Sequence, residues 1–147
     1  MKVKFLLLAT YAEIGPTGQL YIMGADFDAF LTASLPILVP SFYVVGKIQY
    51  DEVEYNNQIN FDVSIIDPDG KSLDYARTSG SLTAGSPRDP NLPAAGGLIV
   101  LIQNCLFQAW GIHWLIVRIN DEEAARLPIK IESVDSVAGG LNSNQPR

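Results

Sequence analysis

Apolar and polar residues alternate along two long segments in the second half of the chain. From Ile59 to Ile65, every second side chain is apolar and those between are mostly polar. The same alternation runs from His113 to Ile119 and resumes at Leu127 after a short polar connection. A period of two residues is typical of a β-strand with one buried and one solvated face. Both segments are therefore predicted to form strands joined into hairpins.

Turn signals divide the rest of the chain into further short strands. Asp67-Pro68-Asp69-Gly70 has the residues that a type I turn favours, and Gly15-Pro16-Thr17-Gly18 predicts a hairpin turn. About eight short strands at spacings near ten residues indicate an all-β sandwich or barrel. The residues predicted to fill its core are Phe42, Val44, Ile48, Phe61, Val63, Ile65, Leu115, Val117, Ile119 and Ile129.

Three segments have a different character. Residues 79–97 are rich in Gly, Pro and Ser, which favours a long exposed loop. Residues 136–147 are expected to form a flexible tail after a single domain spanning residues 1–135. The basic and apolar start of the chain resembles a signal peptide, but Tyr11 and Glu13 follow at once. We therefore expect a first strand there, and a cytoplasmic protein.

Composition limits the classes of partner. Apolar residues make up 48% of the 147 residues and charged residues only 18%, against about 25% in an average domain. This indicates an extra covered face, such as a contact between copies of the chain. The net charge is −6 and the ten basic residues form no run or stripe. Nucleic acid and anionic membrane surfaces are therefore not expected as partners. No apolar stretch approaches the length of a membrane span.

The residues that most often carry catalysis are scarce. His113 is the only histidine, and Cys105 is the only cysteine. No serine lies in a nucleophile-elbow motif, and the alternation turns His113 toward the core. The apolar neighbours of Cys105 indicate a small buried residue rather than a nucleophile. We expect no catalytic residues, no cofactor and no enzyme activity, because a two-carboxylate mechanism would need a pair that the sequence does not place.

Carboxylates around the central hairpin allow one metal hypothesis. Asp67 and Asp69 belong to a group of acidic residues that end loops could bring together for calcium. Their spacing matches no defined calcium loop. The alternative is that both side chains cap the Asp-Pro-Asp-Gly turn.

One set of residues is apolar where a solvated face should be polar. Ile112, Trp114 and Ile116 lie opposite the side of His113, and Tyr43 and Val45 occupy corresponding positions on an earlier strand. Such a face is covered either by another part of the chain or by a second subunit. The segment 79–97 is the candidate for the first. These five residues are the predicted interaction face.

Several local patterns together resemble a family of small uncharacterised bacterial proteins over residues 3–132. The patterns that carry the resemblance are Ala9-Thr10-Tyr11-Ala12, the Gly18, Leu20 and Gly24 hairpin, the Asp67-Pro68-Asp69-Gly70 turn, and the closing segment from Gly111 through Leu127-Pro128-Ile129. The resemblance implies an antiparallel, immunoglobulin-like β-sandwich and assigns no activity. We predict a non-enzymatic interaction or accessory module that forms a homo-oligomer or binds a protein partner. The alternative is a sandwich whose end loops bind calcium, or a glycan through exposed aromatic residues.

Overall fold

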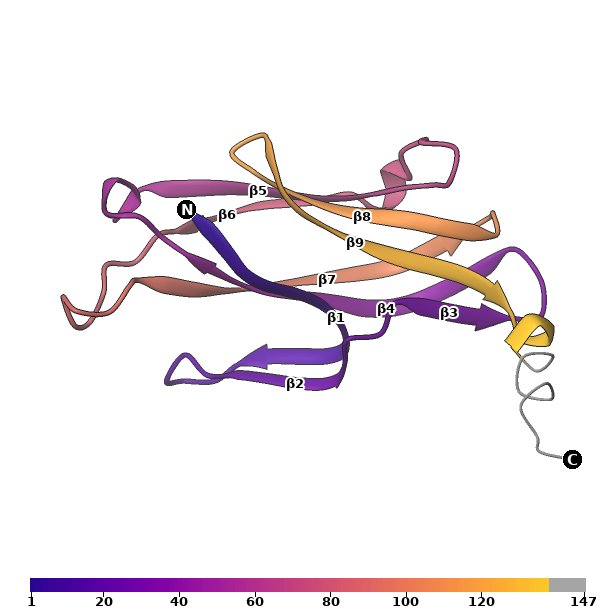
Figure 1. Ribbon diagram of the computed structural model, residues 1–147, viewed down its shortest axis with the longest axis horizontal. Coiled ribbons are helices and arrows are strands. Elements are labelled where there is room, and N and C mark those ends of the chain that lie inside the picture. Colours follow the sequence, from indigo (N-terminus) through magenta and orange to yellow (C-terminus); the bar gives the residue numbers. More distant parts are fainter. Residues whose placement is uncertain (138–147) are drawn as a thin grey trace, which may run out of the picture.

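Nine β-strands account for most of the computed structural model, which describes residues 1–137 (Figure 1). The strands are β1 (Lys2–Ile14), β2 (Leu20–Ala25), β3 (Ala29–Thr32), β4 (Ile37–Gln49), β5 (Gln58–Ile66), β6 (Thr78–Thr83), β7 (Ala95–Phe107), β8 (Gly111–Ile119) and β9 (Glu122–Ser133). Two short 3-10 turns, η1 (Glu52–Glu54) and η2 (Asp74–Ala76), lie beside β5 and β6 along the chain. Residues 138–147, most of the predicted tail, lie outside the described part.

The strands form two facing sheets, so the predicted all-β sandwich is confirmed. Sheet A has the order β2-β1-β4-β7, and sheet B has the order β3-β9-β8-β5-β6. All neighbouring strands are antiparallel except β3 and β9, which run parallel. The short β3 arises in a stretch whose sequence has no clear alternation, and it gains its order by pairing with the end of β9.

The core lies between the sheets and contains the predicted residues. All ten are buried except Phe61, which is half-buried. Phe61 is paired with Gly80 on the edge strand β6, and a Cβ atom at Gly80 would lie 2.6 Å from Cζ of the Phe61 ring. Glycine at this position therefore makes room for an aromatic ring at the open side of the sandwich.

The β1–β2 hairpin adds a partial third layer. β1 pairs with β4 through its first half and with β2 through its second half. In Figure 1, β2 and the end of β1 lie below β4 and β7, away from sheet B. A Cβ atom at Gly97 of β7 would lie 3.1 Å from Leu20 and 3.3 Å from Ile14, so the hairpin extends as far as β7. The predicted first strand is thus confirmed, and it helps to cover the outer face of its own sheet.

Both predicted hairpin turns in the second half are present. The Gly70 amide donates to the Asp67 carbonyl at 3.0 Å, as a β-turn requires. Asn120 and Asp121 both have positive φ and connect β8 directly to β9, which is the two-residue turn that matches strand twist. Asn120 also docks on β5, because its amide donates to the Asn60 carbonyl at 2.8 Å and its side chain accepts from the Asn60 amide at 3.0 Å.

The prediction of a long loop over residues 79–97 is wrong. β6 occupies its beginning and β7 its end, so only residues 84–94 lie outside strands. Small polar residues are compatible with β6 because it is an edge strand that pairs only with β5. Gly96 and Gly97 of β7 leave space for the Tyr50 ring and for the β1–β2 hairpin, which approach them closely. None of the helical segments in residues 1–137 is long and apolar enough to cross a membrane.

Candidate functional site

The five residues of the predicted interaction face lie on two different surfaces. Tyr43 and Val45 project from β4 onto the outer face of sheet A, where they join a small apolar cluster separate from the main core. Ile112, Trp114 and Ile116 project from β8 onto the outer face of sheet B. The two outer faces point in opposite directions, with the core between them. The prediction that these residues form one face is therefore wrong.

On sheet B, polar side chains of the same sheet cover the apolar row. Ile116 is only 4% exposed, and its cross-strand neighbours are Ser64 and Arg126. The Arg126 guanidinium lies 5.6 Å from the centre of the Trp114 ring, a cation–π contact. Glu123 holds that guanidinium through two hydrogen bonds of 2.6 and 2.8 Å. Intramolecular cover thus explains most of this row, and Ile112 is its most exposed member.

A polar network continues across the same outer face. Asp62 pairs with Arg77 at 2.7 Å and with Arg118 at 3.6 Å, and Arg118 donates to the Ser64 hydroxyl at 2.9 Å. Charged groups already bonded to one another must be desolvated before this face can enter an apolar contact. Sheet B is therefore the less suitable face for self-association.

On sheet A, Val45 is completely buried by the β1–β2 hairpin. Its cluster includes Ala9 and Ala12 of β1, with Leu20 and Ile22 of β2 packed against them. Of the two alternatives, intramolecular cover applies to Val45, and the hairpin supplies it instead of residues 79–97. Val45 is consequently a structural residue that no partner can reach in the folded chain.

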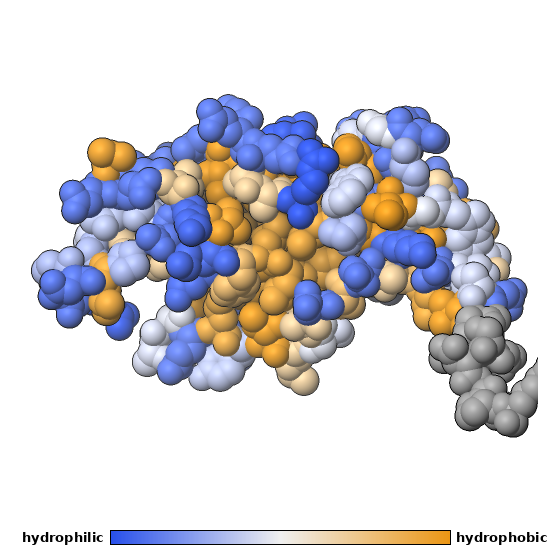
Figure 2. All heavy atoms as spheres, in the orientation of Figure 1, coloured by the Kyte–Doolittle hydropathy of each residue, from blue (hydrophilic) through white to orange (hydrophobic). Residues whose placement is uncertain are grey.

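Beyond the hairpin, sheet A keeps an exposed apolar patch, which we call the tyrosine surface: Tyr11, Met23, Tyr43 and Leu101. Tyr11 pairs with Met23, and Tyr43 pairs with Leu101. The two tyrosine rings join these pairs, with centroids 5.6 Å apart in an edge-to-face contact. Met23 is 66% exposed, Tyr11 42% and Leu101 38%. In Figure 2, hydrophobic side chains likewise reach the surface around β1, flanked by hydrophilic ones.

Sequence reasoning found Tyr43 and missed the other members of this surface as a group. Tyr11 was noted only at the start of the chain and in the Ala9-Thr10-Tyr11-Ala12 pattern, and Met23 and Leu101 gave no separate signal. Their adjacency depends on the pairing of β1 with β2 and of β4 with β7. The alternation in a single strand does not contain that information.

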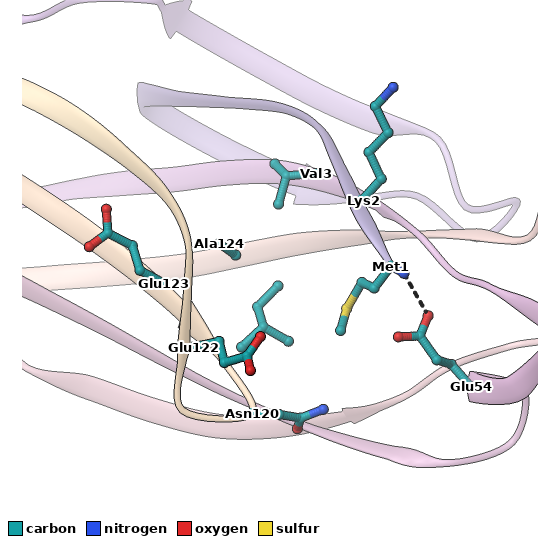
Figure 3. Close-up of a pocket in the computed structure, with 9 residues that line it drawn as sticks. Met1, Lys2, Val3, Glu54, Asn120, Glu122, Glu123 and Ala124 are labelled. Atoms are coloured by element: carbon teal, nitrogen blue, oxygen red, sulfur yellow. Dashed lines mark ion pairs between the residues drawn. The ribbon is translucent and has the colours of Figure 1, made fainter.

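An open cavity of about 730 Å³ lies between the start of β1, η1 and the β8–β9 turn. Figure 3 shows Glu54 and Glu122 beside it, with an ion pair joining Glu54 to the Met1 amino group at 3.3 Å. Glu123 is bonded to Arg126. Of the three carboxylates that line this cavity, those of Glu54 and Glu123 therefore have partners within the chain.

Asp67 acts as a turn residue. Its Oδ1 accepts hydrogen bonds from the Asp69 amide at 2.9 Å and the Lys71 amide at 2.8 Å. This is the side-chain capping considered as the alternative to calcium. Within residues 1–137, no three His, Cys, Asp or Glu side chains gather in a way that would hold a metal ion. The calcium hypothesis for Asp67 and Asp69 gains no support from this geometry.

Cys105 is fully buried in the main core, as its apolar neighbours predict. Burial raises the pKa of its thiol to about 12. A thiol with so high a pKa is protonated at neutral pH and is a poor nucleophile or metal ligand. Cys105 is therefore a small core residue.

His113 is also fully buried, at the end of the core nearest the Asp67 turn. Its ring meets Phe107 edge-to-face with centroids 4.9 Å apart, and its Nδ1 lies 3.4 Å from the Gly111 carbonyl oxygen. Its Nε2 has no hydrogen-bond partner among the described residues. Desolvation lowers the pKa of His113 below its ordinary value of 6.5 and outweighs the opposing effects of the Gly111 carbonyl and the Asp67 charge. The ring is thus neutral in the folded protein at neutral pH.

His113 should make stability depend on pH. Below about pH 6.5 the unfolded chain binds a proton that the folded chain does not, so the free energy of unfolding should fall as the pH falls. The variant His113→Leu should weaken this dependence, because it removes the titrating group and fills a similar volume. Urea denaturation of both proteins from about pH 7.5 to 5.5 measures the difference. Equal slopes for the two proteins would contradict the assignment.

The comparison with known families agrees with the resemblance noted in the sequence. The model of DUF6941, a family of unknown function, matches residues 4–132. The chain belongs to this family. The match covers all of β2 to β8 and nearly all of β1 and β9. A search of curated proteins found no match.

Solved structures give only distant similarities to this DUF6941 member. A β-glucuronidase from glycoside hydrolase family 2 is 18% identical with a TM-score of 0.41, over 66% of this chain and 11% of that chain. A glycosyl hydrolase family 2 member from Bacteroides cellulosilyticus DSM 14838 is 13% identical with a TM-score of 0.41, over 65% of this chain and 14% of that chain. This chain thus spans about an eighth of those enzymes, and scores this low say nothing of its function.

Proposed function

We propose that this DUF6941 protein is a non-enzymatic interaction module that self-associates through sheet A. The tyrosine surface is the observation that carries the proposal. It joins exposed apolar side chains from four neighbouring strands, and no segment of residues 1–137 covers it. Exposed patches of this kind, rich in Tyr and Met, are typical of protein contacts.

The absence of charge from β7 supports sheet A over sheet B, although the Tyr11 hydroxyl of the tyrosine surface donates a hydrogen bond to Glu13 at 2.9 Å. The outer face of sheet B carries the network of Asp62, Arg77 and Arg118, and Glu123 with Arg126. In sheet A, the edge strand β7 has no charged residue at all. A contact between two copies of one chain places like surfaces together, which is least unfavourable where charges are few.

The burial of two reactive side chains, those of His113 and Cys105, supports a non-enzymatic role. The only histidine and the only cysteine are both buried in the core, which withdraws them from contact with a substrate. The cytoplasmic location, expected because the start of the chain reads as a strand instead of a signal peptide, remains a prediction. The glycan alternative gains no support from Tyr11 and Tyr43, whose rings meet edge-to-face and do not form the flat platform on which a sugar stacks.

The variant Leu101→Lys tests the proposal. It places a charge in the tyrosine surface of each copy, and we expect the dissociation constant of the dimer to rise about ten-fold or more. Light scattering with size-exclusion chromatography over a range of concentrations measures this. Val53→Lys is the matched control, because Val53 is 85% exposed on η1, outside the tyrosine surface. Its dissociation constant should equal that of the wild type.

Two results would contradict the proposal. One is a wild-type protein that stays monomeric up to millimolar concentration. The other is equal weakening by Leu101→Lys and Val53→Lys, which would indicate nonspecific association.

A further inference from the structure

Strand β7 ends sheet A, and it lacks the features that usually protect an edge strand. It pairs only with β4, and its thirteen residues, Ala95–Phe107, include no Asp, Glu, Lys, Arg or Pro. Long, uncharged edges of this kind readily accept another strand, because their outward backbone groups are unpaired. The edge of β7 is therefore a site where a strand can be added.

The other open edges of the two sheets are guarded. The edge strand β3 has only four residues, and the part of β9 that it leaves unpaired carries Pro128 and several charged residues. The start of β1, which β2 leaves unpaired, has Lys2 and Lys4 and an irregular register near them. β2 and β6 have six residues each, and Gly24 of β2 adopts a positive φ. Prolines, lysines, irregularities and short length each hinder strand addition. This contrast singles out β7.

The hydrogen-bond register shows which groups of β7 face outward. The Tyr50 amide donates to the Ala94 carbonyl at 2.9 Å, and the pairing with β4 then runs without a shift through Gln103. In an antiparallel ladder, alternate residues bond to the same neighbour. Even-numbered residues such as Val100 therefore bond to β4. The N–H and C=O groups of Gly97, Ile99, Leu101 and Gln103 point away from it.

These outward groups form a free row with clear limits. Among residues 1–137, no hydrogen bond reaches the backbone of Gly97, Ile99, Leu101 or Gln103 from the open side. The row ends at Asn104, where φ becomes positive. Just beyond, the Tyr75 hydroxyl donates to the Leu106 carbonyl and occupies the edge.

We propose that a second copy of this chain adds its own β7 antiparallel to this edge, so that the two four-stranded sheets become continuous. A two-fold axis perpendicular to the sheet pairs β7 with itself, and the absence of charged residues means that no like charges meet. When this axis passes midway between the Val100 residues of the two copies, Ile99 of one copy lies opposite Leu101 of the other. The inference rests on the proposed self-association and names its geometry.

Amide hydrogen exchange, followed residue by residue by NMR, tests the pairing. In the dimer, the amides of Ile99, Leu101 and Gln103 should exchange at least about ten-fold more slowly than in dilute monomer. The amides of Val100 and Ile102 serve as internal references, because they bond to β4 in both states. Equal exchange of the three outward amides in monomer and dimer would overturn the edge pairing.

Two substitutions at Leu101 distinguish a contact through the β7 edge from a contact through the tyrosine surface. Leu101→Pro removes an outward N–H without breaking a bond to β4, and it should abolish the dimer. Leu101→Thr also loses the apolar side chain but keeps the N–H, and it should retain the dimer with a dissociation constant raised less than about ten-fold. Val53→Lys, on η1 outside the tyrosine surface, should leave the dissociation constant unchanged.

The outcomes distinguish the two proposals. A dimer that Leu101→Pro and Leu101→Thr weaken equally would indicate face-to-face contact and would overturn the edge pairing only. A monomeric wild type would overturn the proposed function and the edge pairing together. The exchange experiment uses the wild-type chain, so it decides the question even if Leu101→Pro fails to fold.

Discussion

Replacing Phe107 by alanine should lower the free energy of unfolding by about 3–5 kcal/mol. Phe107 is fully buried at the end of β7. Its ring lies 4.9 Å from the His113 ring and 5.9 Å from the Phe30 ring, measured between centroids. Phe30 in turn lies 5.7 Å from Phe42, so the ring of Phe107 joins residues from both sheets. Its removal leaves a cavity that rigid strands cannot close.

Denaturation in urea measures this effect, and Leu38→Ala is the matched control. Leu38 lies on β4 near the same end of the sheet and is 56% exposed, so its truncation should change the free energy of unfolding by less than about 1 kcal/mol. A loss of less than about 1 kcal/mol for Phe107→Ala would show that this end of the core is not packed as described.

Replacing Val45 by aspartate should lower the free energy of unfolding by about 3 kcal/mol or more. The new carboxylate would lie under the β1–β2 hairpin, in the cluster formed with Ala9 and Ala12, without a cation to pair with. Burying an unpaired charge requires either desolvating it or protonating it, and both are unfavourable at neutral pH. We expect the hairpin to detach or the whole domain to unfold at lower urea concentration.

Met23→Asp provides the comparison for Val45→Asp, because Met23 lies on the exposed side of the same hairpin. Measured in dilute solution, it should change the free energy of unfolding by less than about 1 kcal/mol. If Val45→Asp were tolerated equally well, Val45 would be accessible, as the sequence alone predicts. The two variants therefore decide between a structural and an interaction role for Val45.

Much of the fold could be predicted because the relevant signals are local. The alternation from Ile59 to Ile65 and from His113 to Ile119 corresponds to β5 and β8, and the residues predicted to face inward are nearly all buried. Turn chemistry is equally local, as Asp67 shows by bonding amides two and four residues away. Gly46 lies within β4 where another backbone approaches closely, because a Cβ atom there would lie 3.1 Å from the Phe5 carbonyl oxygen.

The error over residues 79–97 has a different origin. A composition rich in Gly and Ser predicts a weak intrinsic tendency to form strands. Here, pairing with the neighbouring strands β5 and β4 stabilises β6 and the start of β7. Gly80 makes room for the ring of Phe61, and Gly96 makes room for the ring of Tyr50. At these positions the glycines allow close packing rather than mobility.

The sequence alone is sufficient to establish the strands, their turns and which side chains share a side of each strand, because these depend on neighbours a few residues apart. Only the tertiary structure places β4 and β8 in different sheets, lays the hairpin over Val45 and brings Arg126 over Trp114. It also leaves β7 at an edge. Each of these depends on contacts between residues far apart in the chain, and a period of two identifies a side of a strand without saying what will cover it.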